Sequence, residues 1–134
     1  MRLIKRNTDY AIQALTCISS SRGKIISVDY LVGELKMPRP FLRKIMQMLN
    51  KEGIVKSFKG KGGGFKLVVS PEDVSVYDMM TIFQGPFKLN EHILKRKVCP
   101  NVNICKLKKK LDVIEKKLKG DLQKIRISDL KKRA

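Results

Sequence analysis

Residues 38–65, PRPFLRKIMQMLNKEGIVKSFKGKGGGF, decide the fold of this chain. In the first half, apolar residues recur at helical spacing from Phe41 to Leu49, so we expect a helix that starts near Pro38–Pro40 and ends near Lys51. In the second half, two β-prone runs flank a tip made of glycine and lysine. This pattern predicts a two-stranded hairpin, with a cationic and glycine-rich tip, directly after a helix.

Two more helices are expected on the N-terminal side of this stretch. Thr8 is expected to cap a helix over residues 8–20, and Ser27 a second helix that ends near Leu35. A helix, a tight turn, a second helix and a hairpin follow one another in the order of a winged helix-turn-helix. The fold class we predict is therefore mainly α, with a small β-hairpin wing.

The C-terminal side adds one short helix and one long one. Ser75 and Asp78 form a capping-box pattern before a helix that ends at Gln84. Residues 88–105 show no clear periodicity and are expected to form a loop. A long helix is then expected from Lys106 to Ile125, with a narrow apolar stripe at near-heptad spacing. Because so narrow a stripe buries poorly against a small domain, we predict that this helix pairs with a second copy in a homodimer. The stripe comprises Leu107, Leu111, Ile114, Leu118, Leu122 and Ile125.

These patterns divide the chain into three parts. We expect a winged helix-turn-helix DNA-binding domain over residues 1–86, a cysteine-containing sensor loop over residues 87–105, and a dimerisation helix with a basic tail over residues 106–134.

The composition narrows the class of partner. The chain has 134 residues, with 30 Lys and Arg against 12 Asp and Glu, a formal net charge of +18. Such an excess predicts a polyanionic partner, nucleic acid or an anionic membrane surface. No apolar run approaches the ~20 residues that a membrane span requires, and the N-terminus does not fit a signal peptide, so we expect a cytoplasmic protein. The single histidine and the absence of a P-loop or a catalytic carboxylate pair argue against an enzyme.

The helix expected from near Pro38 to Lys51 takes the place of the recognition helix of a helix-turn-helix. This helix and the wing supply the candidate contacts to double-stranded DNA. Arg39 and Arg43 are four residues apart and so share a face of the helix, where an arginine can donate two hydrogen bonds to a guanine. Lys44 and Gln47 are expected at phosphates or at the edge. The wing glycines permit positive φ and close approach of the backbone to phosphates, and the wing lysines supply charge. The predicted DNA-binding residues are Arg39, Pro40, Arg43, Lys44, Lys59, Gly60, Lys61, Gly62 and Gly63.

The chain resembles a known family at these residues. The segment from Ser27 to Leu67, above all the wing sequence 53–65, is similar to the Rrf-type bacterial regulators, which include IscR, NsrR and CymR. The start of the chain, residues 75–85 and residues 127–130 also match the family. Lys59 stands where the family commonly has Arg, which keeps the charge but loses the planar fork of donors. The resemblance implies a DNA-binding transcription regulator.

Two of the three cysteines form the second candidate site. Cys99 and Cys105 are separated by five residues, and lysines around them favour thiolates. Family members that carry an iron–sulfur cluster have a similar pair and one earlier cysteine, and this chain has His92 near that place. The resemblance implies a [2Fe–2S] or [4Fe–4S] cluster held by these three residues and by Asp9 of the partner subunit. Zinc is an alternative metal, and a redox-active pair without a metal is another alternative. Cys17 is expected in the core, as are Met46, Met48, Met79 and Met80.

Three functions therefore stay open at this stage. The first is a regulator that senses redox state, nitric oxide or iron–sulfur status through a cluster or metal. The second is a cluster-free regulator based on thiols. The third is a constitutive, basic nucleic-acid-binding protein with no sensor.

Overall fold

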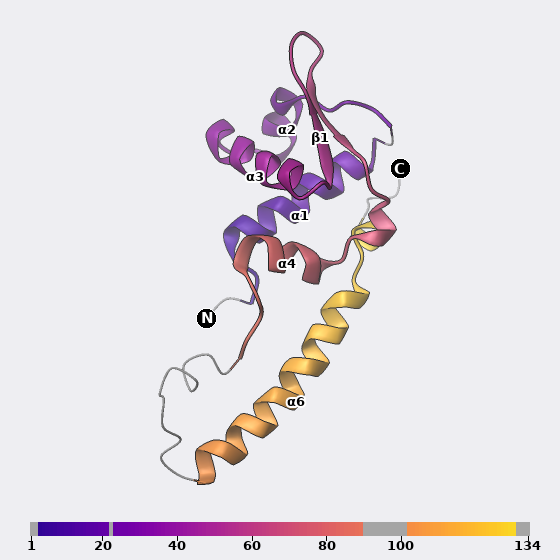
Figure 1. Cartoon of the computed structure of the whole chain (residues 1–134). Coiled ribbons are helices and arrows are strands. Elements are labelled where there is room, and N and C mark those ends of the chain that lie inside the picture. The colour runs from indigo at the N-terminus through magenta and orange to yellow at the C-terminus, as the bar shows by residue number, and fades with distance from the viewer. Residues whose placement is uncertain (1–2, 22, 90–101, 131–134) are drawn as a thin grey trace.

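The computed structural model describes residues 3–21, 23–89 and 102–130, without the side chains of residues 102–105. Figure 1 shows the first helices and the hairpin gathered in one body, from which a long helix extends on the side away from the hairpin. The predicted winged helix-turn-helix with a long C-terminal helix is confirmed. The elements are α1 (Arg6–Ser19), α2 (Val28–Leu35), α3 (Arg39–Lys51), β1 (Val55–Phe58), β2 (Gly64–Leu67), the 3-10 turn η1 (Pro71–Asp73), α4 (Val76–Gln84), α6 (Val102–Lys124) and the 3-10 turn η2 (Ile127–Leu130).

Capping interactions determine where the two helices of the helix-turn-helix begin and end. The Ser27 hydroxyl accepts a hydrogen bond from the Tyr30 backbone N–H at 3.1 Å, as the sequence predicts for the start of α2. The helix ends at Lys36, which adopts the left-handed conformation with φ 52°. Pro38 is the N-cap of α3, and Pro40 stands at the second helical position, where an N–H would have no helical partner. The turn between α2 and α3 is therefore tight.

The start of α1 differs from the prediction. The helix begins at Arg6 with Lys5 as its N-cap, and Thr8 lies inside it. Thr8 is fully buried, and its hydroxyl has no hydrogen-bond partner among the described residues. The capping pattern failed because the apolar contacts that begin at Ile4 extend the helix N-terminally, which moves Thr8 into the interface with the rest of the body.

The hairpin is an antiparallel pair of short strands. Val55 lies opposite Leu67 and Phe58 opposite Gly64. A further bridge joins Phe65 to Ile26, with N–H to carbonyl distances of 2.8 Å in both directions. This bridge holds the start of β2, next to the tip of the hairpin, beside the residue that precedes the cap of α2, so the wing stands next to the helix-turn-helix (Figure 1).

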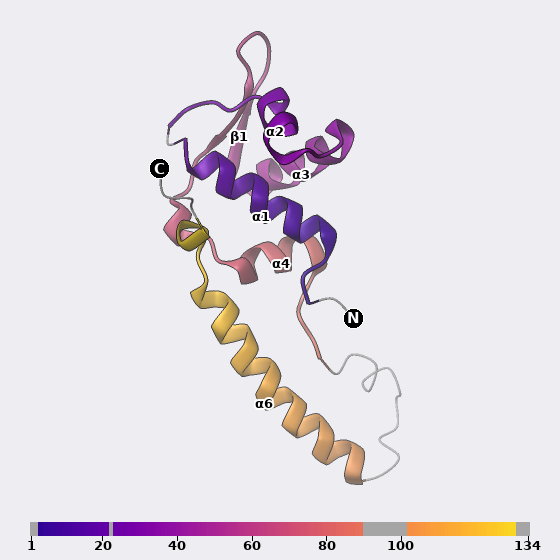
Figure 2. The same cartoon turned by 180° about the vertical axis from the view of Figure 1, so that it is seen from behind.

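The C-terminal half is attached through α4. The predicted capping box is present: the Ser75 hydroxyl accepts from the Asp78 N–H at 3.0 Å, and the Asp78 carboxylate accepts from the Ser75 N–H at 2.9 Å. The end of α6 is tied to the residues before α4, because Val76 donates to Ile125 and Ile127 donates to Val74. The rest of α6 extends away from the body in both views (Figures 1 and 2).

The long helix begins earlier than the sequence predicts. It starts at Val102 rather than at Lys106, so Cys105 lies in a helix and not in the expected loop over residues 87–105. No proline or glycine separates residue 102 from residue 106, and nothing in that segment stops the helix from extending. His92 and Cys99 lie outside the described residues.

Two groups of buried residues hold the body together. The larger joins α1, α2, α3, the wing and η2, and it includes Leu15, Leu42 and Ile127. The smaller joins α4 to the C-terminal part of α6 through Val76, Met80 and Leu122. Among the described residues, no helix is both long and apolar enough to cross a lipid bilayer.

The expected core sulfur residues lie in the core with one exception. Met46, Met79 and Met80 are buried, and Cys17 packs against the larger group. The prediction for Met48 was wrong, because its side chain is 39% exposed. In α3 the residues at 42, 45, 46 and 49 already fill the buried face, and position 48 turns outside it.

Candidate nucleic-acid interface

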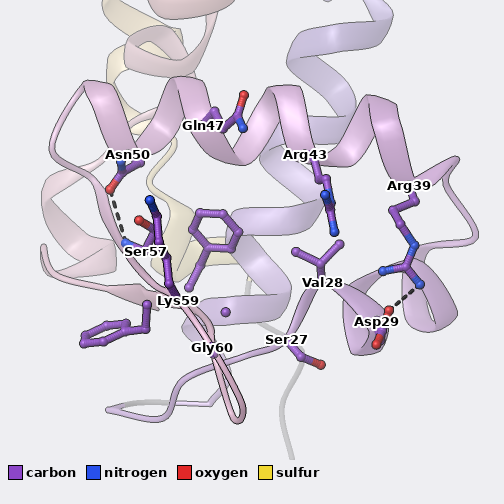
Figure 3. Close-up of a pocket in the computed structure, with 14 residues that line it drawn as sticks. Ser27, Val28, Asp29, Arg39, Arg43, Gln47, Asn50, Ser57, Lys59 and Gly60 are labelled. Atoms are coloured by element: carbon purple, nitrogen blue, oxygen red, sulfur yellow. Dashed lines mark hydrogen bonds and ion pairs between the residues drawn. The ribbon is translucent and has the colours of Figure 1, made fainter.

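A groove lies between the recognition helix α3, the start of α2 and the wing. Its cavity volume is about 440 Å³. Figure 3 shows Arg43 projecting from α3 toward Val28 at the start of α2, and Asn50 projecting from α3 toward Ser57 of the wing. The groove is lined by Ser27, Val28, Asp29, Arg39, Arg43, Gln47, Asn50, Ser57, Phe58, Lys59, Gly60, Gly63, Gly64 and Phe65.

The two predicted recognition arginines are in different situations. Arg39 forms an ion pair with Asp29 in the first turn of α2 (Figure 3). The side chains are 46% and 74% exposed, so solvent screens the pair and it contributes little to stability. The described residues give Arg43 no ion pair, and its guanidinium lines the groove. Arg43 is therefore the arginine whose five N–H donors are open to an acceptor.

A hydrogen bond connects α3 to the wing. The Asn50 side-chain oxygen accepts from the backbone N–H of Ser57 at 3.2 Å (Figure 3). Asn50 stands near the end of α3, and Ser57 stands in β1. The bond fixes the direction in which the hairpin leaves the recognition helix, and with it the width of the groove.

The wing needs its glycines for the approach of its own backbone. A Cβ on Gly63 would lie 2.3 Å from the Phe58 carbonyl oxygen, and a Cβ on Gly64 would lie 2.2 Å from the Ile26 carbonyl oxygen. Gly64 also has a φ of +152°, which side chains rarely permit. The predicted role of positive φ applies to Gly60 and Gly62, with φ of 89° and 78°.

Comparison with known proteins identifies the family. The family model Rrf2, described as "Iron-dependent Transcriptional regulator", matches residues 4–133. The chain belongs to the Rrf2 family. A helix-turn-helix-type transcriptional regulator of Aquifex aeolicus is 30% identical over 123 residues, which cover 90% of this chain and 85% of that protein. The regulator NsrR of Bacillus subtilis is 24% identical over 103 residues, or 75% and 70% of the two chains.

Solved structures show the same fold. CymR, "the Global Cysteine Regulator of B. subtilis", superposes with a TM-score of 0.79 at 21% identity and covers 97% of this chain and 96% of its own. IscR of T. potens superposes with a TM-score of 0.71 at 22% identity, and the match covers 96% of this chain and 85% of that chain. These relatives are transcriptional regulators and not enzymes. This Rrf2 chain is accordingly a transcriptional regulator with the winged helix fold of DNA-binding proteins.

The structure brings together five of the nine predicted DNA-binding residues of this Rrf2 regulator. Arg39, Arg43, Lys59, Gly60 and Gly63 line the groove. The other four are exposed on the surface outside the groove lining: Pro40, Lys44, Lys61 and Gly62.

Sequence reasoning missed part of the groove. Gln47 was expected at the edge, and Asn50 was not predicted, although both continue the helical spacing that begins at Arg39 and Arg43. Asp29 comes from another helix. Only the packing of α2 against α3 reveals its contact with Arg39.

The candidate metal ligands are described only in part. Asp9 lies in the first turn of α1 and is exposed. Cys105 lies near the start of α6, and the starts of α1 and α6 stand well apart within the chain (Figures 1 and 2). Among the described residues, no group of three His, Cys, Asp or Glu could hold a metal ion.

Proposed function

We propose that this Rrf2 regulator is a cytoplasmic homodimer that reads a specific sequence in double-stranded DNA with α3 and the wing. The observation that carries the proposal is the groove, which is lined both by Arg43 of α3, open to acceptors, and by Lys59 of the wing. A recognition helix inserts its N-terminal part into the major groove, and a cationic wing lies against neighbouring phosphates or in the minor groove. Arg43 stands in the N-terminal half of α3, as this arrangement requires.

Selection of binding sites from a random-sequence library tests this proposal. The full chain should enrich one motif, and Arg43→Ala should relax it at one base pair, at a cost of about 1–3 kcal/mol in discrimination. Lys51→Ala is the matched control, because Lys51 is an exposed cation at the far end of the same helix and outside the groove lining. If both variants lose affinity equally on all sequences, Arg43 is a phosphate contact and the proposal for it fails.

The dimer is proposed from the exposed apolar side of α6. Leu107 is 48% exposed and Ile114 is 53% exposed, and the two share a side of the helix. Burial of such side chains against a second α6 removes apolar surface from water at about 25 cal/mol per Å². Ile114→Asp should give a monomer in sedimentation equilibrium. Val113→Asp is the control, because Val113 is more exposed, at 70%, and lies on a different side. A monomeric wild-type chain would contradict the proposal.

The sensor is proposed at the start of α6. Cys99, Cys105 and His92, with Asp9 of the partner subunit, offer two thiolates, an imidazole and a carboxylate, a donor set that suits iron or zinc. The exposure of Asp9 and the distance of α1 from the start of α6 within one chain support a ligand from the partner. A cluster would supply redox chemistry or a ligand-binding iron beside the dimer helix.

The symmetry of the proposed dimer would couple the state of the sensor to the binding of DNA. A dimer engages half-sites about one helical turn apart, roughly 34 Å. The sensor segment leads directly into α6, so a change there alters how the two subunits pair and how far apart the α3 helices lie. Anaerobic purification followed by iron and sulfide assays and an absorption spectrum tests the cluster. Zinc without sulfide supports a zinc site, and neither metal supports the cluster-free thiol regulator.

A further inference from the structure

The C-terminal part of the sequence is rich in positive charge. Residues 87–134 hold 16 of the 30 Lys and Arg but only 5 of the 12 Asp and Glu. In both views α6 extends from the body on the side opposite to the wing (Figures 1 and 2). A straight duplex that lies in the groove of one subunit is therefore turned away from the α6 of that subunit. The positive charge that α6 carries therefore needs a separate explanation.

The sides of α6 differ in character. The C-terminal part of the apolar stripe packs on α4 through Leu118 and Leu122, and the neighbouring Lys119 lies over the ring of Tyr77, at 5.2 Å to the ring centroid. The N-terminal part of the same stripe is exposed and is the part assigned above to the dimer. Another side is basic, and at 3.6 residues per turn it gathers six lysines over about 27 Å of helix. These residues, here called the lysine face, are Lys106, Lys109, Lys110, Lys116, Lys117 and Lys124.

The residues that the structure describes do not neutralise the lysine face. All six side chains are exposed, and none forms an ion pair within the described residues. The other two positions on this side are Val113 and Gly120, and Asp121 lies at its edge. By contrast Lys108, on another side, is paired with Asp112 at 3.3 Å. Like charges held in a row repel one another, and pairing of two α6 helices would bring two such rows close together. An anion bound along the face relieves this repulsion.

The chemistry of the face selects among anionic partners. Helices that bind membrane surfaces insert a wide apolar and aromatic face, whereas α6 has no aromatic residue and the lysine face has only Val113. Protein interfaces are depleted in lysine and rely on aromatic or arginine anchors. Regularly spaced point charges without an apolar anchor match a repeating anion that carries one charge per unit, which describes a nucleic-acid backbone.

We propose that the lysine face of α6 binds the phosphates of a second segment of double-stranded DNA, independently of sequence. The first segment lies in the groove between α3 and the wing. A bound dimer would in this way join two DNA segments, or two parts of one molecule brought together by a loop. The lysine face itself depends only on α6 and not on which sequence the groove reads.

Lysine acetylation with mass-spectrometric readout tests the two sites separately. The full chain is titrated with a random-sequence duplex, and the acetylation of each lysine is followed. Lys59 and Lys61 report on the wing, the lysine face reports on the second site, and Lys108 and Lys119 serve as internal references. Protection should reach the wing first and the lysine face only at higher duplex concentration. Protection of the wing alone overturns this inference and leaves the proposed function intact. Simultaneous protection of both overturns it too, because one duplex would then contact both surfaces.

Two double variants test whether the weaker binding of DNA depends on the lysine face or only on the total charge of the chain. K110Q/K117Q removes two charges from the lysine face, and K108Q/K119Q removes two from other sides of the same helix; glutamine preserves helix propensity. For the weaker binding step, K110Q/K117Q should lower the slope of log K against log salt by about 1.8, from about 0.9 per phosphate. The control should leave that slope unchanged. Equal effects of the two variants, or equal protection of the face by polyglutamate or by phosphatidylglycerol vesicles, would overturn the assignment to DNA.

Discussion

Replacement of Gly64 by alanine should be among the most damaging single changes in the wing. A Cβ there would lie 2.2 Å from the Ile26 carbonyl oxygen and 2.8 Å from the Ser27 Cα. Both are backbone atoms, so no side-chain rotation relieves the clash. The strand must move away and break the pair of hydrogen bonds between Ile26 and Phe65, each 2.8 Å long.

The cost has two parts that the geometry defines. Each lost backbone hydrogen bond costs about 1 kcal/mol, and a side chain at the φ of Gly64 adds about 1–3 kcal/mol of backbone strain. We therefore expect Gly64→Ala to lower the free energy of unfolding by about 3–5 kcal/mol, a large share of the 5–15 kcal/mol typical of a domain. Gly33→Ala should have the opposite sign, because Gly33 lies within α2 with open space around it, and alanine in a helix gains about 0.5–1 kcal/mol.

Equilibrium unfolding in urea, followed by circular dichroism, measures both variants. The Gly64→Ala midpoint should fall and the Gly33→Ala midpoint should rise, with similar slopes. Hydrogen exchange at the Phe65 amide should also become faster in Gly64→Ala. A Gly64→Ala protein within 1 kcal/mol of wild type would refute the steric reasoning and the role of the Ile26–Phe65 bridge in holding the wing.

Three further changes test single contacts. Asp29→Asn should free Arg39 for a phosphate, so the slope of log K for DNA against log salt should steepen by about 0.9. The free energy of unfolding should change by less than about 1 kcal/mol. An unchanged slope would show that Arg39 makes no contact with DNA. Asn50→Ala should speed exchange of the Ser57 amide by about fivefold, for a bond of about 1 kcal/mol; unchanged exchange would deny that Asn50 holds the wing. Ser75→Ala should lower the free energy of unfolding by about 0.5–2 kcal/mol, and a change near zero would mean that the capping box adds nothing.

Predictions from the sequence were most accurate where local interactions, such as helix caps, determine the structure. The caps of α2 and α4 lie at Ser27 and Ser75, and the hairpin begins where the run after Gly53 predicts it. Thr8 shows the limit of this reasoning, because a capping residue type inside a longer helix is indistinguishable from a cap until the packing of α1 is known.

Contacts between different elements could not be predicted from the sequence. The pairing of Asp29 with Arg39 depends on the packing of two helices, and the bond from Asn50 to Ser57 depends on the turn between α3 and β1. Met48 was assigned to the core because it is apolar and follows Ile45 at helical spacing, but its side chain is 39% exposed. The spacing gives the apolar side of a helix, whereas the width of the side that is buried follows from the packing of its neighbours.

The central claim is that α3 and the wing read a DNA sequence, and one ratio tests it most directly. The full chain is titrated at fixed salt with a duplex that carries the motif selected from a random library, and with a random duplex of equal length. The account predicts an affinity ratio of about 10³ or more, as dedicated regulators show. A ratio near one, with a steep dependence of both affinities on salt, would contradict it and leave a purely electrostatic binder of nucleic acid.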